Sequence, residues 1–356
     1  MKIEVREAKN QREIEIAFKL ASQSFGNGEL NVDEMEAKKV IWFSDPSFSL
    51  DNIILAFNSD QIVGVVRIVP KILCRMQIQY TVAGFSSICI DKQFRGKKIS
   101  VPLIQEAIAI AERRKFDLAL LVARKAVDHY YVQFGFHGIS SYEKISIEAK
   151  KISLIDEKIT FTPIENNLIP LYSNRYYENY FECFGRFLRT YSQWKFILHL
   201  ISLRRNMEAL TILYDDEPIG YCFIQNGKVC ELAVLPKFSL ATILANLKQS
   251  NKIDQIDDWF DLPSNHLLIR NSNGFEIRVQ RRECSYGGHM ARILQIEKFV
   301  RNYEERTGKS FKVSQKTNLN IDHKRLNQLL GCWAVSTAES EDNGLIPFNL
   351  SYMDQF

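Results

Sequence analysis

The residues best placed to do chemistry lie between Ser86 and Ser100, in the stretch SSICIDKQFRGKKIS. An apolar strand pattern ends near Ile90, and a basic turn containing Gly96 precedes a segment with helical apolar spacing. The first N–H groups of a helix have no partner within it, so with the helix dipole they bind anions. Glycine lets a phosphate approach the backbone closely. The stretch is therefore either a phosphate-binding turn or an ordinary strand-to-helix connection with solvated lysines.

A second candidate is Tyr131, in an aromatic segment that follows the apolar run 117–122. A tyrosine hydroxyl can donate a proton in a reaction, but aromatic clusters also form cores. Cys89 has no evident histidine partner and is interpreted as a core or pocket-wall thiol. The six histidines show no metal-ligand spacing, so we expect no metal site.

The elements that must position these residues alternate between strand and helix signals. We expect strands at 2–5, 53–57, 62–69, 79–90 and 117–122, and helices at 11–25 and 98–115. These elements suit the α+β fold with mixed sheets that the family resemblance described below implies.

A second stretch repeats the plan of the first, with strands at 211–214, 219–224 and 229–234 and a helix at 239–249. The first copy has Arg95-Gly96 at the turn before its helix, and the second copy has no such pair. The pattern thus predicts a degenerate second copy. Further along, we expect a helix at 291–303, strands at 311–321 and a helix at 322–330.

Composition limits the function classes. The net charge is +4 over 356 residues, with no basic stripe, so we expect no nucleic-acid partner. Seven scattered cysteines indicate reduced thiols. No apolar run is long enough to span a membrane, and the N-terminus lacks the apolar core of a signal peptide. These patterns predict a cytoplasmic protein without membrane association.

The order of the two candidates resembles the GNAT N-acetyltransferase superfamily, where an Arg/Gln-x-x-Gly-x-Gly/Ala loop precedes a Tyr-x-x-x-Gly-Phe segment. The resemblance implies acetyl-CoA as co-substrate, a primary amine as acceptor, and Tyr131 as the acid that protonates the departing thiolate. The family's middle glycine is Lys98 here, and its last small residue is Ser100. The residues that the resemblance assigns to acetyl-CoA are Ile88, Cys89, Ile90, Arg95, Gly96, Lys97, Lys98, Ile99 and Ser100.

More specifically, the chain resembles the Eis-like (enhanced intracellular survival) subgroup of that superfamily. The resemblance rests on the segments TVAG at 81–84, FGRFLRTYSQW at 184–194 and MARILQIE at 290–297. It implies two tandem GNAT-like domains, a shortened sterol-carrier-protein-like domain and a homo-oligomer. The implied domains are 1–150 with the acetyl-CoA site, 151–285 as a degenerate copy, and 286–356 with a tail that reaches the active site.

The subgroup also ends in an aromatic residue whose main-chain carboxylate enters the first active site, and this chain ends in Phe356. The resemblance therefore implies the Phe356 carboxylate as the base that deprotonates the amine. Asp354 is open to two readings, as an attractor of a cationic amine or as a solvated residue.

Two rival functions remain open on these residues. One is a transferase with a longer acyl donor, an aminoacyl donor or a protein lysine as acceptor. The other is a non-catalytic module that binds coenzyme A or another ligand on the same fold.

Overall fold

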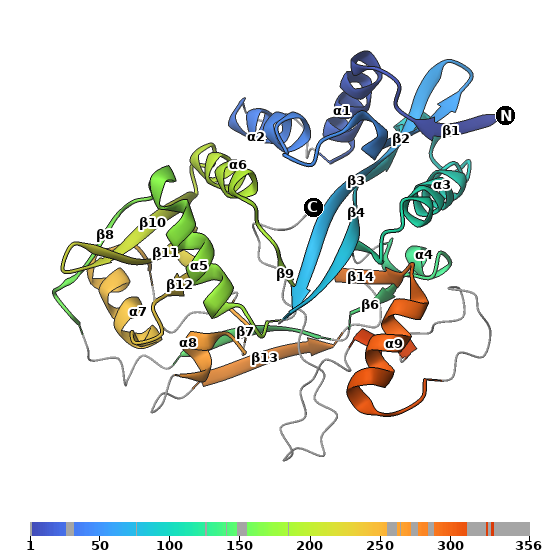
Figure 1. Ribbon diagram of the computed structural model, residues 1–356. Coiled ribbons are helices and arrows are strands. Elements are labelled where there is room, and N and C mark those ends of the chain that lie inside the picture. Colours follow the sequence, from blue (N-terminus) through green and yellow to red (C-terminus); the bar gives the residue numbers. More distant parts are fainter. Residues whose placement is uncertain are drawn as a thin grey trace.

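The computed structural model describes residues 2–25, 32–75, 77–124, 127–139, 141–147, 155–183, 185–254, 262–263, 265–271, 277–283, 288–311, 325–326 and 329–330. These residues form two lobes that a two-stranded ribbon joins (Figure 1). The first lobe contains the larger sheet and the second lobe contains a four-stranded sheet.

The sheet of the first lobe has the strand order β1-β2-β3-β4-β5-β14-β6, with β9 paired to β3. Every neighbouring pair is antiparallel except β4 and β5, which are parallel. Its strands are β1 (Ile3–Glu7), β2 (Ile53–Asn58), β3 (Gln61–Arg75), β4 (Ile78–Ile90), β5 (Leu118–Ala123), β14 (Gly288–Ile293), β6 (His137–Gly138) and β9 (Arg186–Phe187).

Helices cover both faces of this sheet because its strands are apolar on both sides. On β2, Ile53 and Leu55 pack with α1 (Gln11–Phe25), while Ile54 and Ala56 pack with α3 (Ser100–Arg113). This alternation follows from the two-residue period of a strand. The other helices of this lobe are α2 (Val32–Phe43), α4 (Asp128–Val132) and α9 (Ile296–Thr307).

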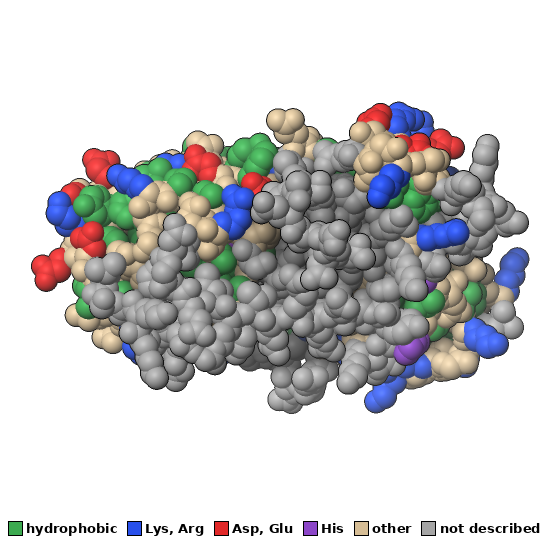
Figure 2. All heavy atoms as spheres, turned by 90° about the horizontal axis from the view of Figure 1, so that it is seen from below, with side chains coloured by type: hydrophobic (Ala, Val, Ile, Leu, Met, Phe, Trp, Pro, Cys, Tyr) green, Lys and Arg blue, Asp and Glu red, His purple; other side chains and the backbone are tan. Residues whose placement is uncertain are grey.

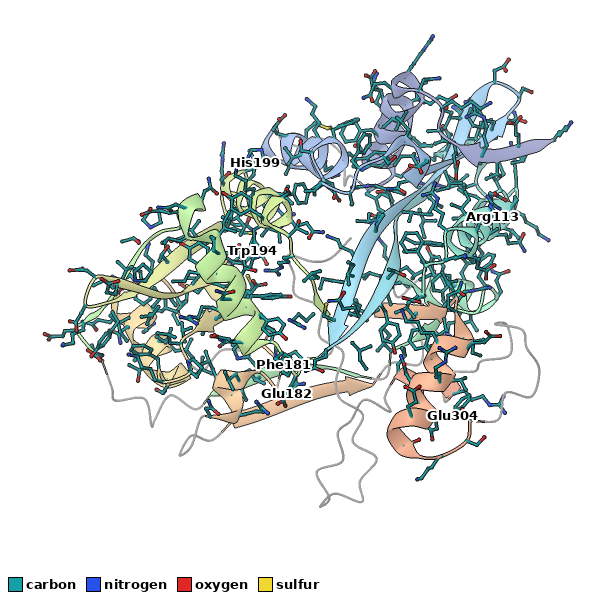
Figure 3. All side chains as sticks on the ribbon, in the orientation of Figure 1. Arg113, Phe181, Glu182, Trp194, His199 and Glu304 are labelled. Atoms are coloured by element: carbon teal, nitrogen blue, oxygen red, sulfur yellow. The ribbon has the colours of Figure 1, made fainter. Side chains whose placement is uncertain are left out.

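The second lobe has the antiparallel strand order β12-β11-β10-β8. Its buried Trp194 lies in the interior between helix and sheet, whereas Arg113 of the first lobe points outward (Figure 3). Lys and Arg side chains mix with Asp and Glu over this lobe when it is seen from below (Figure 2). Its elements are β8 (Ile159–Pro163), β10 (Met207–Tyr214), β11 (Glu217–Gln225), β12 (Lys228–Val234), α5 (Ile169–Asn179), α6 (Tyr191–Ser202), α7 (Leu240–Gln249) and α8 (Leu267–Arg270).

The joining ribbon pairs β7 (Ser141–Ile147) with β13 (Ile277–Glu283). The chain then returns to the first lobe, where β14 lies between β5 and β6. The sequence had predicted a helix over 291–303, and its first residues are wrong: Ala291–Ile293 belong to β14, and the helix α9 begins at Ile296. Short apolar runs fit a strand or a helix equally well, and here the free edge of β5 decides.

The segment after β14 is fixed to the first lobe by Asp117. Its carbonyl oxygen accepts hydrogen bonds from the backbone of Leu294 and Gln295, and its carboxylate accepts from Lys298 Nζ at 2.7 Å. Tyr80 of β4 stacks on Phe299 of α9 with ring centroids 4.4 Å apart. The predicted elements at 311–321 and 322–330 lie almost wholly outside the described residues. In the described part of the chain, no helix is both long and apolar enough to cross a bilayer.

Candidate functional site

Strands β4 and β5 separate where the sequence places the chemistry. Their parallel pairing runs from Val82–Leu118 to Phe85–Leu121, yet β4 continues to Ile90. The edge of β4 beyond Phe85 therefore has no partner on β5. A one-residue register shift against β3 occurs here, and Ser87 has a left-handed φ of 53°. Such a bulge re-aims the backbone and leaves N–H groups free for a ligand.

The basic turn follows directly. Asp91 accepts a hydrogen bond from Gln93 N at 2.8 Å, and Arg95 Nε donates to the Ile90 carbonyl at 3.2 Å. Gly96 and Lys98 have φ of 79° and 58°. Lys98 thus adopts the left-handed conformation that glycine favours, so the backbone of the turn follows a path that a glycine could take.

Helix α3 begins at Ser100 without a side-chain cap at its N-terminus. Pro102 has no N–H, and the N–H groups of Val101 and Leu103 donate to the carbonyls of Lys98 and Ile99 at 3.2 and 3.4 Å. The N–H of Ser100 is therefore the group at this helix start that is available to an anion. Arg95, Gly96, Lys97 and Lys98 are exposed beside it, whereas the side chain of Ile99 is buried in the core. Lys97 Nζ lies 4.6 Å from the centroid of the Phe94 ring.

Tyr131 lies on α4, next to the open edge of β4. Only 9% of its surface is exposed, and Tyr130 and Phe136 pack edge-on against it. Burial raises the pKa of Tyr131 to about 12, with a smaller contribution from Tyr130. Its hydroxyl is therefore protonated at neutral pH, as an acid must be. The hydroxyl of the neighbouring Tyr130 hydrogen bonds to Ser100 Oγ at 2.6 Å.

Cys89 is buried to 7% exposure on the α1 side of the sheet. Burial raises the pKa of its thiol to about 11. The thiol is then protonated at neutral pH and is a poor nucleophile. This supports the interpretation of Cys89 as a wall residue.

A cavity of about 750 Å³ joins these features. Its lining includes six of the residues that the sequence singled out, namely Ile88, Cys89, Ile90, Arg95, Ser100 and Tyr131. The turn residues Gly96, Lys97, Lys98 and Ile99 lie outside that lining. Phe356 and Asp354 lie outside the described residues.

Sequence reasoning missed the other walls of this cavity. Helix α2 contributes Lys38, Ile41, Trp42 and, just beyond its end, Asp45. This i, i+3, i+4, i+7 spacing marks one helix face, but two of the four residues are charged, so it gives no apolar stripe. α6 and the residues after it contribute Phe196, Leu200 and Arg204, and β3 contributes Arg67, Val69 and Lys71.

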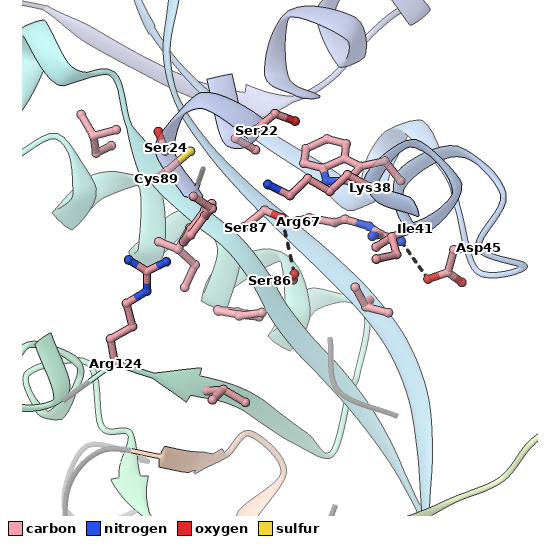
Figure 4. A pocket seen from close by; sticks show the side chains of 18 of the residues that line it. Ser22, Ser24, Lys38, Ile41, Asp45, Arg67, Ser86, Ser87, Cys89 and Arg124 are labelled. Atoms are coloured by element: carbon pink, nitrogen blue, oxygen red, sulfur yellow. Dashed lines mark hydrogen bonds and ion pairs between the residues drawn. The ribbon is translucent and has the colours of Figure 1, made fainter. Parts of the chain in front are cut away.

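Arg67 and Asp45 form a buried ion pair on this wall (Figure 4). Arg67 Nη2 lies 2.7 Å from Asp45 Oδ2, and the two side chains are 3% and 6% exposed. Burial lowers the pKa of Arg67 and the Asp45 carboxylate opposes that shift. An arginine stays protonated even so. The Trp42 ring lies 5.9 Å from the guanidinium carbon.

The described residues show no group of three His, Cys, Asp or Glu side chains arranged to hold a metal ion. The donors that the site does offer are backbone N–H groups and cations. They fit the pyrophosphate and amide groups of an acyl-coenzyme A, because an uncapped helix N-terminus accepts phosphate and an unpaired strand edge accepts amides.

Residues 4–139 match the family model of the acetyltransferase (GNAT) domain. No curated protein matches the chain. Among solved structures, a conserved protein of unknown function from Enterococcus faecalis, described as a probable N-acyltransferase, is 16% identical with a TM-score of 0.60. That likeness covers 84% of this chain and 75% of the other.

Two further solved structures are similar at comparable identity. A GCN5-related N-acetyltransferase from Anabaena variabilis is 15% identical with a TM-score of 0.56, over 84% of this chain and 74% of that one. Eis1 from Mycobacterium abscessus is 16% identical with a TM-score of 0.55, over 84% and 76%. At these identities the structures establish the α+β fold with mixed sheets. The family match identifies an acetyltransferase (GNAT) domain at residues 4–139, and acyl transfer is the activity that this domain supports.

Proposed function

We propose that this protein transfers an acetyl group from acetyl-CoA to a primary amine by direct attack. The observation that carries the proposal is the separation of β4 from β5 beyond Phe85, with Tyr131 in the same cavity. The free edge at Ile88 to Ile90 would hydrogen bond the pantetheine amides. The N–H groups from Arg95 to Ser100 would bind the pyrophosphate.

The chemical step forms an amide bond and breaks the thioester C–S bond. The amine nitrogen attacks the thioester carbonyl carbon and loses a proton to a base, while the C–S bond breaks and Tyr131 donates its hydroxyl proton to the thiolate. Backbone N–H groups near the bulge at Ser87 would stabilise the oxyanion. The protonated state of Cys89 favours direct transfer over an acyl-cysteine route.

The base in this proposal is the main-chain carboxylate of Phe356. Support for it comes from the Eis-like resemblance of the sequence and from the chemical need for a proton acceptor, since Phe356 lies outside the described residues. The same resemblance supports a sterol-carrier-like domain at 286–356, a degenerate copy at 151–285 and an oligomer. A cytoplasmic location also stays a prediction.

Calorimetry with acetyl-CoA and a thiol-release assay with primary amines test the proposal. The variants are Tyr131→Phe and a chain extended beyond Phe356, with Tyr177→Phe on the surface of α5 as the control. We expect kcat to fall about 10²–10⁴-fold in Tyr131→Phe, the usual contribution of a general acid, with acetyl-CoA binding unchanged. The extension should lower kcat likewise, and the control should behave as the native protein.

An unchanged kcat in Tyr131→Phe would remove the assigned acid. Full activity in the extended chain would remove the terminal base. Absence of acetyl-CoA binding would overturn the donor itself and point to another acyl carrier.

A further inference from the structure

The cavity is cationic on the side away from the phosphate-binding turn. Its lining carries six Lys and Arg side chains and one carboxylate, that of Asp45. The six are Lys38, Arg67, Lys71, Arg95, Arg124 and Arg204. Asp45 is already paired with Arg67, so the described lining has a clear excess of positive charge.

The register of β3 on β4 separates these charges into two groups. Gly64 lies opposite Ile90 at the phosphate-binding turn, Arg67 lies opposite Ser86, and Lys71 lies opposite Val82. At roughly 3.3 Å per residue, Lys71 is about 23 Å along the strand from the level of the turn. Arg95 belongs to the turn itself, whereas Lys71 stands where β4 and β5 are still paired.

The alternation of side chains along β3 places these charges on one face of the sheet. Val66 and Ile68 pack in the core with α3, and Val65 packs with α1. Arg67, Val69 and Lys71 alternate with Val66 and Ile68, so they point to the opposite face, where α2 and α6 close the cavity. Figure 4 shows Lys38, Ile41 and Asp45 on the same side of the sheet as Arg67. Four cations therefore line the acceptor side, namely Lys38, Arg67, Lys71 and Arg204.

Two of these charges have no carboxylate partner in the described part of the chain. Lys38 and Lys71 are partly buried, and neither forms an ion pair with a described residue. Cations in a cavity with few counter-charges raise the local potential and attract anions. They also disfavour an ammonium ion and favour the neutral amine, which is the nucleophile.

Building on the acetyl transfer proposed above, we infer that the acceptor is an anionic amine, a molecule that carries a carboxylate or phosphate besides its primary amino group. Lys38 binds the anionic group while the amine reaches the thioester near Ser86 and Tyr131, and Lys71 adds positive charge further along β3. The proposed Phe356 carboxylate would leave the acceptor side positive, since Asp45 is already paired with Arg67 and both Lys38 and Lys71 remain. Polyamines and other polycations are excluded by the same charge.

Three amines of matched chain length test the inference: γ-aminobutyrate, n-butylamine and putrescine, which differ in the charge at the end remote from the reacting amine. We expect acetyl-CoA-dependent turnover to rank them in that order by kcat/KM. The anionic amine should gain about 10- to 100-fold over n-butylamine, as a charge-assisted hydrogen bond provides.

The matched variants are Lys38→Glu and Lys39→Glu, adjacent on α2. Lys38 lines the cavity, whereas Lys39 lies in the surface groove between α1 and α2, 3.7 Å from Glu36. Lys38→Glu should lower kcat/KM for γ-aminobutyrate about 10- to 100-fold and raise that for putrescine. Lys39→Glu should leave the ranking unchanged, and both variants should bind acetyl-CoA as the native protein does.

The results distinguish a wrong acceptor from a wrong proposed reaction. If putrescine is preferred while acetyl-CoA binds, the anionic acceptor is wrong and the transferase stands. If no amine is acetylated, calorimetry of γ-aminobutyrate against the protein with coenzyme A decides. Binding that Lys38→Glu weakens keeps the anion site, and no binding overturns it.

Discussion

Both lobes contain a strand that leads through a turn into a helix, but the surroundings of this unit differ between the lobes. In the first lobe β4 leads through the basic turn into α3, and in the second lobe β12 leads through Leu235–Phe238 into α7. Each strand is antiparallel to the strand before it, and each pairing contains a register shift. What distinguishes the lobes is the free edge of the strand.

The edge of β4 beyond Phe85 receives one side-chain hydrogen bond among the described residues, from Arg95 to the Ile90 carbonyl, whereas several side chains bond to the edge of β12. The N–H of Leu232 donates to the Tyr180 hydroxyl at 3.3 Å, and the Leu232 carbonyl lies 2.9 Å from His266 Nε2. The Val234 carbonyl accepts from Asn179 Nδ2 at 2.9 Å. The helix N-termini differ in the same sense, since Ser239 caps α7 and no side chain caps α3. In the second lobe, side chains of the protein form hydrogen bonds with the backbone of the strand edge. In the first lobe, most of the corresponding backbone groups are left for a ligand.

β12 carries a buried ion pair at the position that corresponds to the bulge of β4. Arg189 Nη1 and Nη2 lie 2.6 and 2.8 Å from the two carboxylate oxygens of Glu231, and the Tyr221 hydroxyl donates to the same carboxylate at 2.8 Å. The side chains of Arg189 and Glu231 are 1% and 0% exposed. The comparison teaches that one backbone plan yields a binding edge or a structural core, depending on which side chains cover the edge.

The largest expected effect tests the structural role of that ion pair. Glu231→Ala leaves the Arg189 charge buried without its partner, so the free energy of unfolding should fall by about 3–5 kcal/mol in urea titrations. Glu208→Ala breaks the exposed pair with Lys252, 3.0 Å apart, and should cost less than about 1 kcal/mol. The double variant Arg189→Met/Glu231→Leu should recover most of the loss. Equal losses in the two single variants would refute the structural role of Glu231.

The second prediction concerns the pH dependence of stability that arises from His266, whose ring contacts the edge of β12. Burial lowers the pKa of His266 to about 3. The unfolded chain, with a histidine pKa of about 6.5, binds the proton first. His266 therefore contributes stability above about pH 6.5 that is lost as the pH falls toward 3, on the order of a few kcal/mol.

His266→Gln should accordingly be less stable than the native protein at neutral pH and should lose less stability on acidification. Thermal or urea unfolding followed at a series of pH values checks this. His199→Gln, an exposed position on α6 (Figure 3), is the control and should keep the native slope. A native slope in His266→Gln would show that another group carries the acid sensitivity.

The smallest expected effect concerns the open edge. Lys98 already has the left-handed φ of 58°, so Lys98→Gly should preserve the turn. Relief of about 1–2 kcal/mol of left-handed strain is offset by about 0.5–1 kcal/mol of glycine entropy, so the free energy of unfolding should rise by at most about 1.5 kcal/mol. The Kd for acetyl-CoA, measured by calorimetry, should change less than about tenfold, or 1.4 kcal/mol. A much larger gain in affinity would show that the lysine side chain obstructs the phosphate site.

Much of the first lobe could be predicted because its signals are local. The helix at Gln11–Phe25 was placed at its observed bounds, and the long strand and the helix after the basic turn were placed within two residues. The hairpin was found, but its second strand, expected at 62–69, continues to Arg75. Each shows in apolar period or turn residues. The strand β14 was missed because its pairing partners, β5 and β6, precede it by about 150 residues or more, and no local pattern records such an edge.

The sequence by itself predicted the candidate residues of the site, because the basic turn, the strand before it and Tyr131 lie close together in the chain. Only the tertiary structure shows the cationic wall of the cavity, because Lys38, Lys71 and Arg204 come from three parts of the chain that are far apart in sequence. The tertiary structure also decided that the strand edge of the second lobe is occupied, since Tyr180 and His266 reach β12 only once that lobe has folded. The local sequence predicts which backbone N–H and C=O groups lie in a strand or turn. Long-range packing determines which of these groups already have a protein partner and which are left for a ligand.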